Sequence, residues 1–164
     1  MINKINISFL TMFGIGYSRF APGTIASFAT CLFYIFCFNF NVNIKFLTFC
    51  IFVVLVYSIL IIDKYSQYFE SVDAKEIVID EFVGQSIPAL SIYSIISQYF
   101  FGQFIILILI SFVLFRFFDV LKPFPINLID KKIKNGFGVM LDDIVAGIFT
   151  SIIVLITLFF VSDV

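Results

Sequence analysis

Residues 142–161 read DDIVAGIFTSIIVLITLFFV, so a pair of carboxylates is followed directly by a long apolar run. The run Ile144–Val161 carries no charged residue and approaches the ~20 residues that a straight bilayer-spanning helix needs. Four further apolar runs precede it, several of them shorter: Ile25–Phe40, Phe46–Ile62, Phe82–Phe101 and Phe104–Phe115. Because only helices and closed barrels satisfy their backbone inside a bilayer, the pattern predicts an all-α integral membrane bundle. We expect about five short or tilted spans in a single domain covering residues 1–164.

The amino-acid composition excludes an ordinary soluble domain. Hydrophobic residues make up 62% of the chain and charged residues only 13%, with a mean hydropathy of +1.13. A typical soluble domain has roughly 45–50% apolar and about 25% charged residues. The cysteines Cys31, Cys37 and Cys50 lie inside apolar runs without Cys-x-x-Cys spacing, so we expect them to be reduced, buried and inert.

Charged residues are concentrated in three polar islands, Met1–Thr24, Asp63–Glu81 and Arg116–Asp143. Five spans would place the amino terminus and all three islands on the same side of a membrane. Nine of the ten Lys and Arg residues, all except Lys45, lie in these islands. Because positive charge near span ends favours the cytoplasmic side, we expect the islands to face the cytoplasm.

The breaks between apolar runs indicate where the chain turns. Lys4 is followed by a mixed stretch and the first long run starts only after Thr24, so we expect no cleavable signal peptide and insertion through internal spans. Only Gly102-Gln103 separates the third run from the fourth, which predicts a tight hairpin at that point.

Several kinds of catalytic site are excluded by what the chain lacks. It contains no histidine, which excludes His-containing triads, His-ligated metals and phosphohistidine chemistry. No cysteine lies near an Arg-bearing loop that could hold a phosphate, and no Asp-x-Asp pair is present. The remaining catalytic groups are carboxylates, hydroxyls, Lys and Arg, and these suit a hard cation such as Mg²⁺.

Two pairs of adjacent carboxylates stand at the entrances of predicted spans. Asp80 and Glu81 precede the third run, and Asp142 and Asp143 precede the last. One carboxylate of each pair has a structural explanation, because a negative charge stabilises a helix start by ~0.3–1 kcal/mol. The second carboxylate lacks that explanation. Gln85 also extends the first pair's polar face into the membrane, where polar groups are costly and usually functional.

Three basic residues accompany the carboxylates. Arg116 and Asp119 are three residues apart and share a helix face, with Lys122 close by, while Arg19 belongs to the glycine-containing stretch GIGYSRFAPGT (14–24). The structural alternatives are a surface ion pair between Arg116 and Asp119, worth only ~0–1 kcal/mol, and contacts of Arg19 and Lys122 with lipid headgroups. The functional interpretation is that Arg19, Arg116 and Lys122 bind a substrate phosphate.

The predicted topology brings five carboxylates to the cytoplasmic ends of three spans: Asp80, Glu81, Asp119, Asp142 and Asp143. Such a group would repel itself unless a cation neutralised it. We therefore predict a Mg²⁺ site with Asp80, Glu81, Asp142 and Asp143 as ligands, and Asp119 as a further ligand or as a partner that positions Lys122. All five are candidate catalytic residues for an in-line attack of water at phosphorus, and any of them could be the base.

Four motifs make the chain resemble the phosphatidylglycerophosphatase A family of bacterial lipid phosphatases. They are APGT (21–24), IDEFVG (79–84), FRFFDVLKPFPI (115–126) and GVMLDDIVAG (138–147), in the family's order and approximate spacing. The resemblance spans nearly the whole chain. It implies a Mg²⁺-dependent enzyme on an all-helical fold in the bacterial inner membrane. That enzyme would remove the terminal phosphate of phosphatidylglycerophosphate to give phosphatidylglycerol, from a site that faces the cytoplasm.

Other function classes match the residues less well. A phosphotransferase acting on a CDP-activated lipid would carry an Asp-Gly…Ala-Arg…Gly…Asp…Asp run, and this chain has none. A small transporter would place its carboxylates near mid-span, whereas here they cluster at one face. With a net charge of −1, the chain lacks the strongly basic surface expected of a nucleic-acid-binding protein. The expected partners are the lipid bilayer and the phospholipid substrate.

Overall fold

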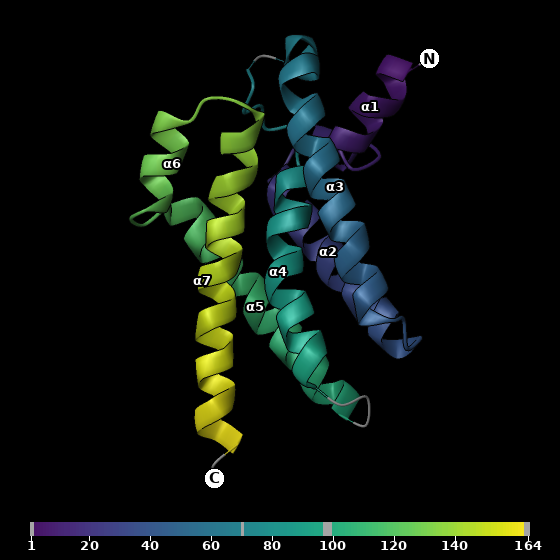
Figure 1. Cartoon of the computed structure of the whole chain (residues 1–164), viewed down its shortest axis with the longest axis vertical. Coiled ribbons are helices and arrows are strands. Elements are labelled where there is room, and N and C mark those ends of the chain that lie inside the picture. Colours follow the sequence, from purple (N-terminus) through teal and green to yellow (C-terminus); the bar gives the residue numbers. More distant parts are fainter. Residues whose placement is uncertain (1, 70, 97–99, 163–164) are drawn as a thin grey trace.

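The computed structural model describes residues 2–69, 71–96 and 100–162, and all regular structure in these ranges is helical. In chain order the elements are α1 (Ile2–Leu10), the 3-10 turn η1 (Ile15–Tyr17), α2 (Pro22–Asn39), α3 (Ile44–Tyr65), the 3-10 turn η2 (Ser66–Tyr68), α4 (Ile79–Ile95), α5 (Phe101–Leu121), α6 (Ile126–Lys132) and α7 (Gly136–Ser162). The amino-terminal and carboxy-terminal ends lie at opposite ends of the bundle (Figure 1). The all-α prediction is therefore confirmed.

Four helices are long and apolar enough to cross a membrane: α2, α3, α5 and α7. The fifth predicted span corresponds to α4, which has 17 residues with Pro88 inside it and runs through the middle of the bundle. The predicted count of about five thus becomes four long apolar helices around one shorter central helix.

The central helix α4 is buried because it packs against α2, α3, α5 and α7. Small residues such as Gly84 and Ala89 lie on it, and small residues let membrane helices approach closely. The outer helices instead expose large apolar side chains, such as Phe49 on α3 and Val113 on α5, each 64% exposed. Apolar side chains on the outside of a helical bundle are expected where lipid is the solvent.

Two apolar clusters hold the two ends of the bundle together. One joins α1, α3, α4 and α7 through residues such as Leu10, Ile62 and Met140. The other lies at the far end, where Phe38 of α2 stacks on Phe104 of α5 with ring centroids 3.8 Å apart. Because the first cluster ties α1 to the start of α4 and α7, it supports the region where the predicted carboxylates enter the bundle.

Two sequence predictions about helix ends are wrong. Gly102 and Gln103 do not form the turn between α4 and α5, because both lie in the first turn of α5. The connection falls earlier, and residues 97–99 lie outside the described residues. A glycine near a helix start costs little, because no other residue packs against it there.

The second error concerns α7, which begins at Gly136, so Asp142 and Asp143 lie inside the helix and not at its start. Its first amides are capped by other residues. Asp63 of α3 accepts a hydrogen bond from the Gly136 amide at 2.6 Å, and Asn135 accepts one from the Gly138 amide at 3.0 Å. With the cap supplied from elsewhere, neither Asp142 nor Asp143 is needed for it.

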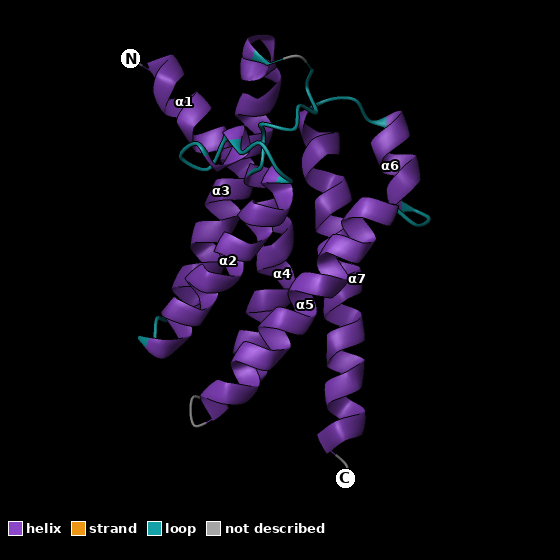
Figure 2. Ribbon diagram, turned by 180° about the vertical axis from the view of Figure 1, so that it is seen from behind, coloured by secondary structure: helices purple, strands orange, loops and turns teal. Residues whose placement is uncertain are grey.

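The polar islands gather at one end of the bundle. Figure 2 shows α1, α6 and the connection between α3 and α4 in the same upper part of the molecule. A backbone hydrogen bond of 3.0 Å from the Val78 amide to the Leu10 carbonyl links the first island to the second. The third island contains α6 and the start of α7, so all three islands border the entrance of α4.

Candidate metal and phosphate site

Three carboxylates converge where α4 and α7 meet. Asp80 and Glu81 belong to the first turn of α4, and Asp143 comes from α7. One oxygen of each lies within 4.8 Å of the others, and this is the one such group of His, Cys, Asp or Glu among the described residues. Below, Asp80, Glu81 and Asp143 are called the carboxylate triad.

Asp80 and Asp143 are buried, Glu81 is partly buried, and all three are incompletely hydrogen-bonded. Asp80 is only 8% exposed and Asp143 only 4%. Asp80 Oδ1, Glu81 Oε2 and Asp143 Oδ2 have no hydrogen-bond partner among the described residues. Burying a carboxylate without a partner is costly, and three together repel one another as well. Three carboxylates at this spacing, each with an unpartnered oxygen, fit a hard divalent cation, which prefers carboxylate oxygen ligands.

Close packing of α4 against α7 explains how the triad assembles. A Cβ built on Gly84 of α4 would lie 2.8 Å from the carbonyl oxygen of Asp143 and 2.9 Å from its Cβ. A Cβ built on Gly147 of α7 would collide with the carbonyl oxygen of Gly84. Since neither glycine has a side chain, the backbones approach closely enough for Asp143 to reach the two carboxylates of α4.

Arg116 of α5 lies beside the triad. Its Nη1 is 3.8 Å from Glu81 Oε1 and 2.5 Å from Asp119 Oδ2. The buried Arg116 Nε has no hydrogen-bond partner among the described residues. Arg116 is therefore held in place by two carboxylates, and its guanidinium brings a fixed positive charge to the triad.

The first turn of α2 closes another side of the site. A Cβ built on Gly23 would collide with Glu81 Oε1 and lie 3.1 Å from Arg116 Nη1. The chain enters this turn through Ala21, which has a left-handed φ of 41°, and Pro22 occupies the start of the helix. The APGT motif thus places the backbone of Gly23, which has no side chain, against the Glu81 carboxylate. A larger residue at position 23 would displace that carboxylate.

A separate ion-pair network lies next to the triad. The Lys122 ammonium donates hydrogen bonds to Asp142 Oδ2 at 2.7 Å and to Asp130 Oδ1 at 3.0 Å. Burial disfavours the charged form of Lys122, but these two carboxylates outweigh it and raise the pKa of Lys122. Burial would likewise raise the pKa of Asp130, yet the hydrogen bond from Lys122 and the nearby lysine charges lower it overall. Lys122 thus joins α5, α6 and α7.

The structure brings five of the predicted site residues together. Asp80, Glu81 and Asp143 form the triad, with Arg116 and Asp119 beside it. Asp119 is close enough for its charge to act on both Glu81 and Asp143.

The other predicted residues lie apart from these groups. Asp142 points to Lys122 and is absent from the triad, although its charge acts on Asp143. Arg19 is exposed in the α1–α2 connection and its side chain makes no ion pair or hydrogen bond with a described residue.

Sequence reasoning missed Asp130 and the structural role of Gly23. Asp130 lies among Lys131, Lys132 and Lys134, so its surroundings indicated only a basic surface. Its spacing of four residues from Lys134 was the available signal, and the two side chains do pair, at 3.8 Å. The importance of Gly23 depends on an approach between α2, α4 and α5, which spacing along the chain does not reveal.

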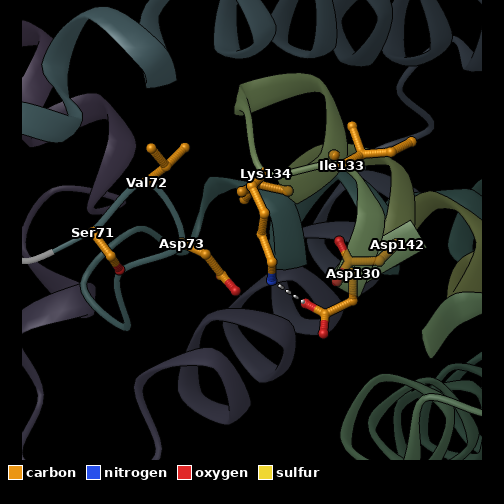
Figure 3. A pocket seen from close by; sticks show the side chains of 9 residues that line it. Ser71, Val72, Asp73, Asp130, Ile133, Lys134 and Asp142 are labelled. Atoms are coloured by element: carbon orange, nitrogen blue, oxygen red, sulfur yellow. Dashed lines mark ion pairs between the residues drawn. The ribbon is translucent and has the colours of Figure 1, made fainter. Parts of the chain in front are cut away.

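A cavity of about 320 Å³ opens beside the ion-pair network. Its walls come from the α3–α4 connection, the end of α6 with the residues that follow, and α7. Figure 3 shows Asp73, Lys134 and Asp130 pointing toward one another across it. Asp142 belongs to both the cavity wall and the ion-pair network, so the cavity adjoins the site.

Comparison with known proteins gave consistent results. The model of the family described as "Phosphatidylglycerophosphatase A" matches residues 8–158. A protein of that name from Haemophilus influenzae is 49% identical over 82 residues, which are 50% of this chain and 45% of that protein. One of the same name from Escherichia coli is 35% identical over 79 residues, 48% of this chain and 41% of that protein.

A longer match has a different name. A "Putative phosphatidylinositol-3-phosphatase" from Bacteroides thetaiotaomicron is 29% identical over 147 residues, which are 88% of this chain and 87% of that protein. The matched segments cover less than half of the Haemophilus and Escherichia proteins but most of the Bacteroides one. No solved structure matches the chain.

Proposed function

This chain belongs to the phosphatidylglycerophosphatase A family, and on that premise we propose that it hydrolyses the terminal phosphate of phosphatidylglycerophosphate to give phosphatidylglycerol. The observation that carries the proposal is the carboxylate triad with its unpartnered oxygens, next to the guanidinium of Arg116. A phosphomonoester needs its negative charge neutralised at such a place, and a site between apolar helices suits a lipid substrate.

The triad residues Asp80, Glu81 and Asp143 would hold Mg²⁺. Their unpartnered oxygens are the structural support for this cofactor. When bound, Mg²⁺ would supply Lewis-acid stabilisation of the charge that develops on the phosphoryl group.

The chain's other groups handle the substrate. Arg116 binds the phosphate through the positive charge of its guanidinium, and Asp119 positions that group. Water forms the new bond to phosphorus and gives up a proton to a nearby carboxylate. The phosphorus–oxygen ester bond breaks, the carboxyl proton passes to the leaving oxygen to form the hydroxyl of phosphatidylglycerol, and inorganic phosphate is released. Lys122 already contacts Asp130 and Asp142, so its contribution is to offset their charge beside the incoming phosphate.

The site would face the cytoplasm from the bacterial inner membrane. Nine of the ten Lys and Arg residues lie in the polar islands, and these islands border the entrance of α4 together with the triad. Positive residues near span ends favour the cytoplasmic side.

A second candidate substrate follows from the Bacteroides relative, whose name refers to a phosphorylated inositol lipid and whose match covers most of both chains. The same triad and Arg116 would act on either phosphomonoester. Both lipids therefore belong in one assay.

The test is phosphate release by purified protein in detergent, with Mg²⁺ or with EDTA, from phosphatidylglycerophosphate and from phosphatidylinositol 3-phosphate. We expect Mg²⁺-dependent release from phosphatidylglycerophosphate and its loss in Asp143→Asn, because that change removes a triad oxygen charge. Glu76→Gln is the matched control, since Glu76 lines a different cavity with Tyr17 and Tyr68. Release that is unaffected by EDTA and by Asp143→Asn would contradict the site, and release from the inositol lipid alone would change the substrate.

A further inference from the structure

The cavity beside the site is lined by charged and polar side chains together with apolar ones such as Val72 and Val139. Its walls include Ser71 and Asp73 from the α3–α4 connection, Asp130 and Lys134 from the α6 region, and Asp142 from α7. Its volume of about 320 Å³ lies at the lower end of the ~300–1,000 Å³ of small-molecule sites. The space therefore suits one small group and not a whole lipid.

The cavity is adjacent to the triad through α7. Asp142 is on the cavity wall and Asp143, the next residue, is in the triad. Successive residues of an α-helix point about 100° apart, so the two sites occupy neighbouring faces of the same turn. A group joined to a phosphate at the triad could therefore extend into the cavity.

The lining excludes three kinds of occupant. A phosphate would meet three carboxylates, which repel it. A divalent cation would need converging oxygens, and among the described residues only the triad has three at that spacing. An acyl chain would have to bury Asp73, Asp130 and Lys134, which is costly. A neutral group with hydroxyl donors remains.

Most lining charges already have partners, with one exception. Asp142 accepts from Lys122, and Asp130 pairs with both Lys122 and Lys134. Asp73 makes no hydrogen bond or ion pair within the described part of the chain, although Figure 3 shows its carboxylate directed toward Lys134 and Asp130. Asp73 is exposed at the cavity wall, so its carboxylate is an acceptor that a ligand hydroxyl can reach.

We propose that this cavity binds the hydroxyl-bearing part of the substrate's headgroup, with Asp73 as the hydrogen-bond acceptor and Ser71 beside it. The inference rests on the proposed function, because the reacting phosphate at the triad is what places the neighbouring carbons in the cavity. Lys134 is 63% exposed, so its charge would be available to the phosphate that joins the headgroup to the lipid. Asp73 is then a specificity-determining residue that does not touch the reacting atoms.

The experiment measures kcat/KM of the wild-type protein and of Asp73→Ala on each of two substrates. One substrate is phosphatidylglycerophosphate, and the other is the same lipid with its free glycerol hydroxyl replaced by hydrogen. We expect Asp73→Ala to lower kcat/KM about tenfold for the hydroxyl substrate, mainly through KM, and to leave the deoxy substrate unchanged. Wild-type protein should prefer the hydroxyl substrate by the same factor.

Controls separate this inference from a folding defect and from failure of the proposed function. Asp73→Asn keeps an acceptor oxygen and should retain part of the preference, while Glu76→Ala removes a carboxylate from the same connection and should change nothing. Wild-type rates that are equal for the two lipids, or an Asp73→Ala loss that is equal for both, would overturn this inference alone. No release from either lipid by the wild type would overturn the proposed function and this inference with it.

Discussion

Asp142 and Asp143 are neighbours in the sequence, yet one lies in a region where carboxylates are paired with lysine and the other in a region where they are not. Asp143 joins Asp80 and Glu81 in a buried group whose free oxygens have no protein donor. Asp142 accepts a hydrogen bond of 2.7 Å from Lys122, which also binds Asp130. In the Lys122 network each carboxylate has a lysine partner, whereas the carboxylate triad has excess negative charge.

The difference is the reason we propose the triad, and not the Lys122 network, as the cation site. Ion pairs in the Lys122 network balance charge within the protein, so they serve to connect α5, α6 and α7. The triad has Arg116 at its edge, but that guanidinium is shared with Asp119. Unbalanced buried charge is rare in structural regions and frequent at functional ones, so the triad is where we place the metal.

The largest expected effect compares one substitution in each region. Asp80→Asn should lower Mg²⁺-dependent phosphate release at least about 100-fold. Mutating a residue that only hydrogen-bonds to a metal ligand already lowers metal affinity or activity by about 10–100-fold. Asp142→Asn should cost only about tenfold, since Lys122 keeps Asp130. Binding of Mn²⁺ measured by electron paramagnetic resonance should be lost in the first variant and kept in the second. Equal losses of binding would remove the distinction between the two regions.

An intermediate effect is expected from widening the contact between α4 and α7. Gly147→Ala would place a Cβ against the Gly84 carbonyl, so the helices must separate. We expect a loss of about 1–3 kcal/mol in stability, as for other overpacked sites, together with weaker Mn²⁺ binding. Thermal unfolding and metal titration in detergent would measure both.

Gly102→Ala is the control for that experiment, because a Cβ there meets nothing within 4 Å. It should leave both stability and metal binding close to wild type. If Gly147→Ala also behaves like wild type, the close approach of the two helices is not what assembles the triad.

The smallest expected effect concerns pH and the Lys122 network. Because the pKa of Asp130 is lowered in the fold, its contribution to stability is present at neutral pH and is lost as the pH falls through that lowered value. Asp130 is partly exposed, so Asp130→Asn should cost only ~0–1 kcal/mol at pH 7. Thermal unfolding from pH 7 to pH 3 should show the difference between Asp130→Asn and wild type shrinking in acid. A difference that grows in acid would contradict the assignment.

Part of the site could be predicted from local patterns. Adjacent carboxylates at Asp80–Glu81 and Asp142–Asp143 stood out because helix capping explains only one member of each pair. The ion pair of Arg116 with Asp119 followed from their spacing. The turn at Gly102 was predicted wrongly, because a glycine in an apolar sequence resembles a break even where the helix continues.

Other features needed the packed structure. Asp142 and Asp143 had equal claims as metal ligands in the sequence, and the rotation of α7 against α4 and α5 separates them. Arg19 had the same claim as Arg116, but only Arg116 contacts Glu81. The cavity beside Asp73 joins residues from three separate segments, so no motif indicates it.

The sequence by itself determined the all-helical membrane fold and the end of the bundle where charge collects, because hydropathy and charge act through the solvent that each residue prefers. Only the tertiary structure decided which carboxylates lack partners. That choice depends on contacts of a few ångströms between helices, which are possible because Gly23, Gly84 and Gly147 have no side chain. The residue type alone determines a side chain's chemical group, whereas its interaction partner depends on which neighbouring helix that side chain faces.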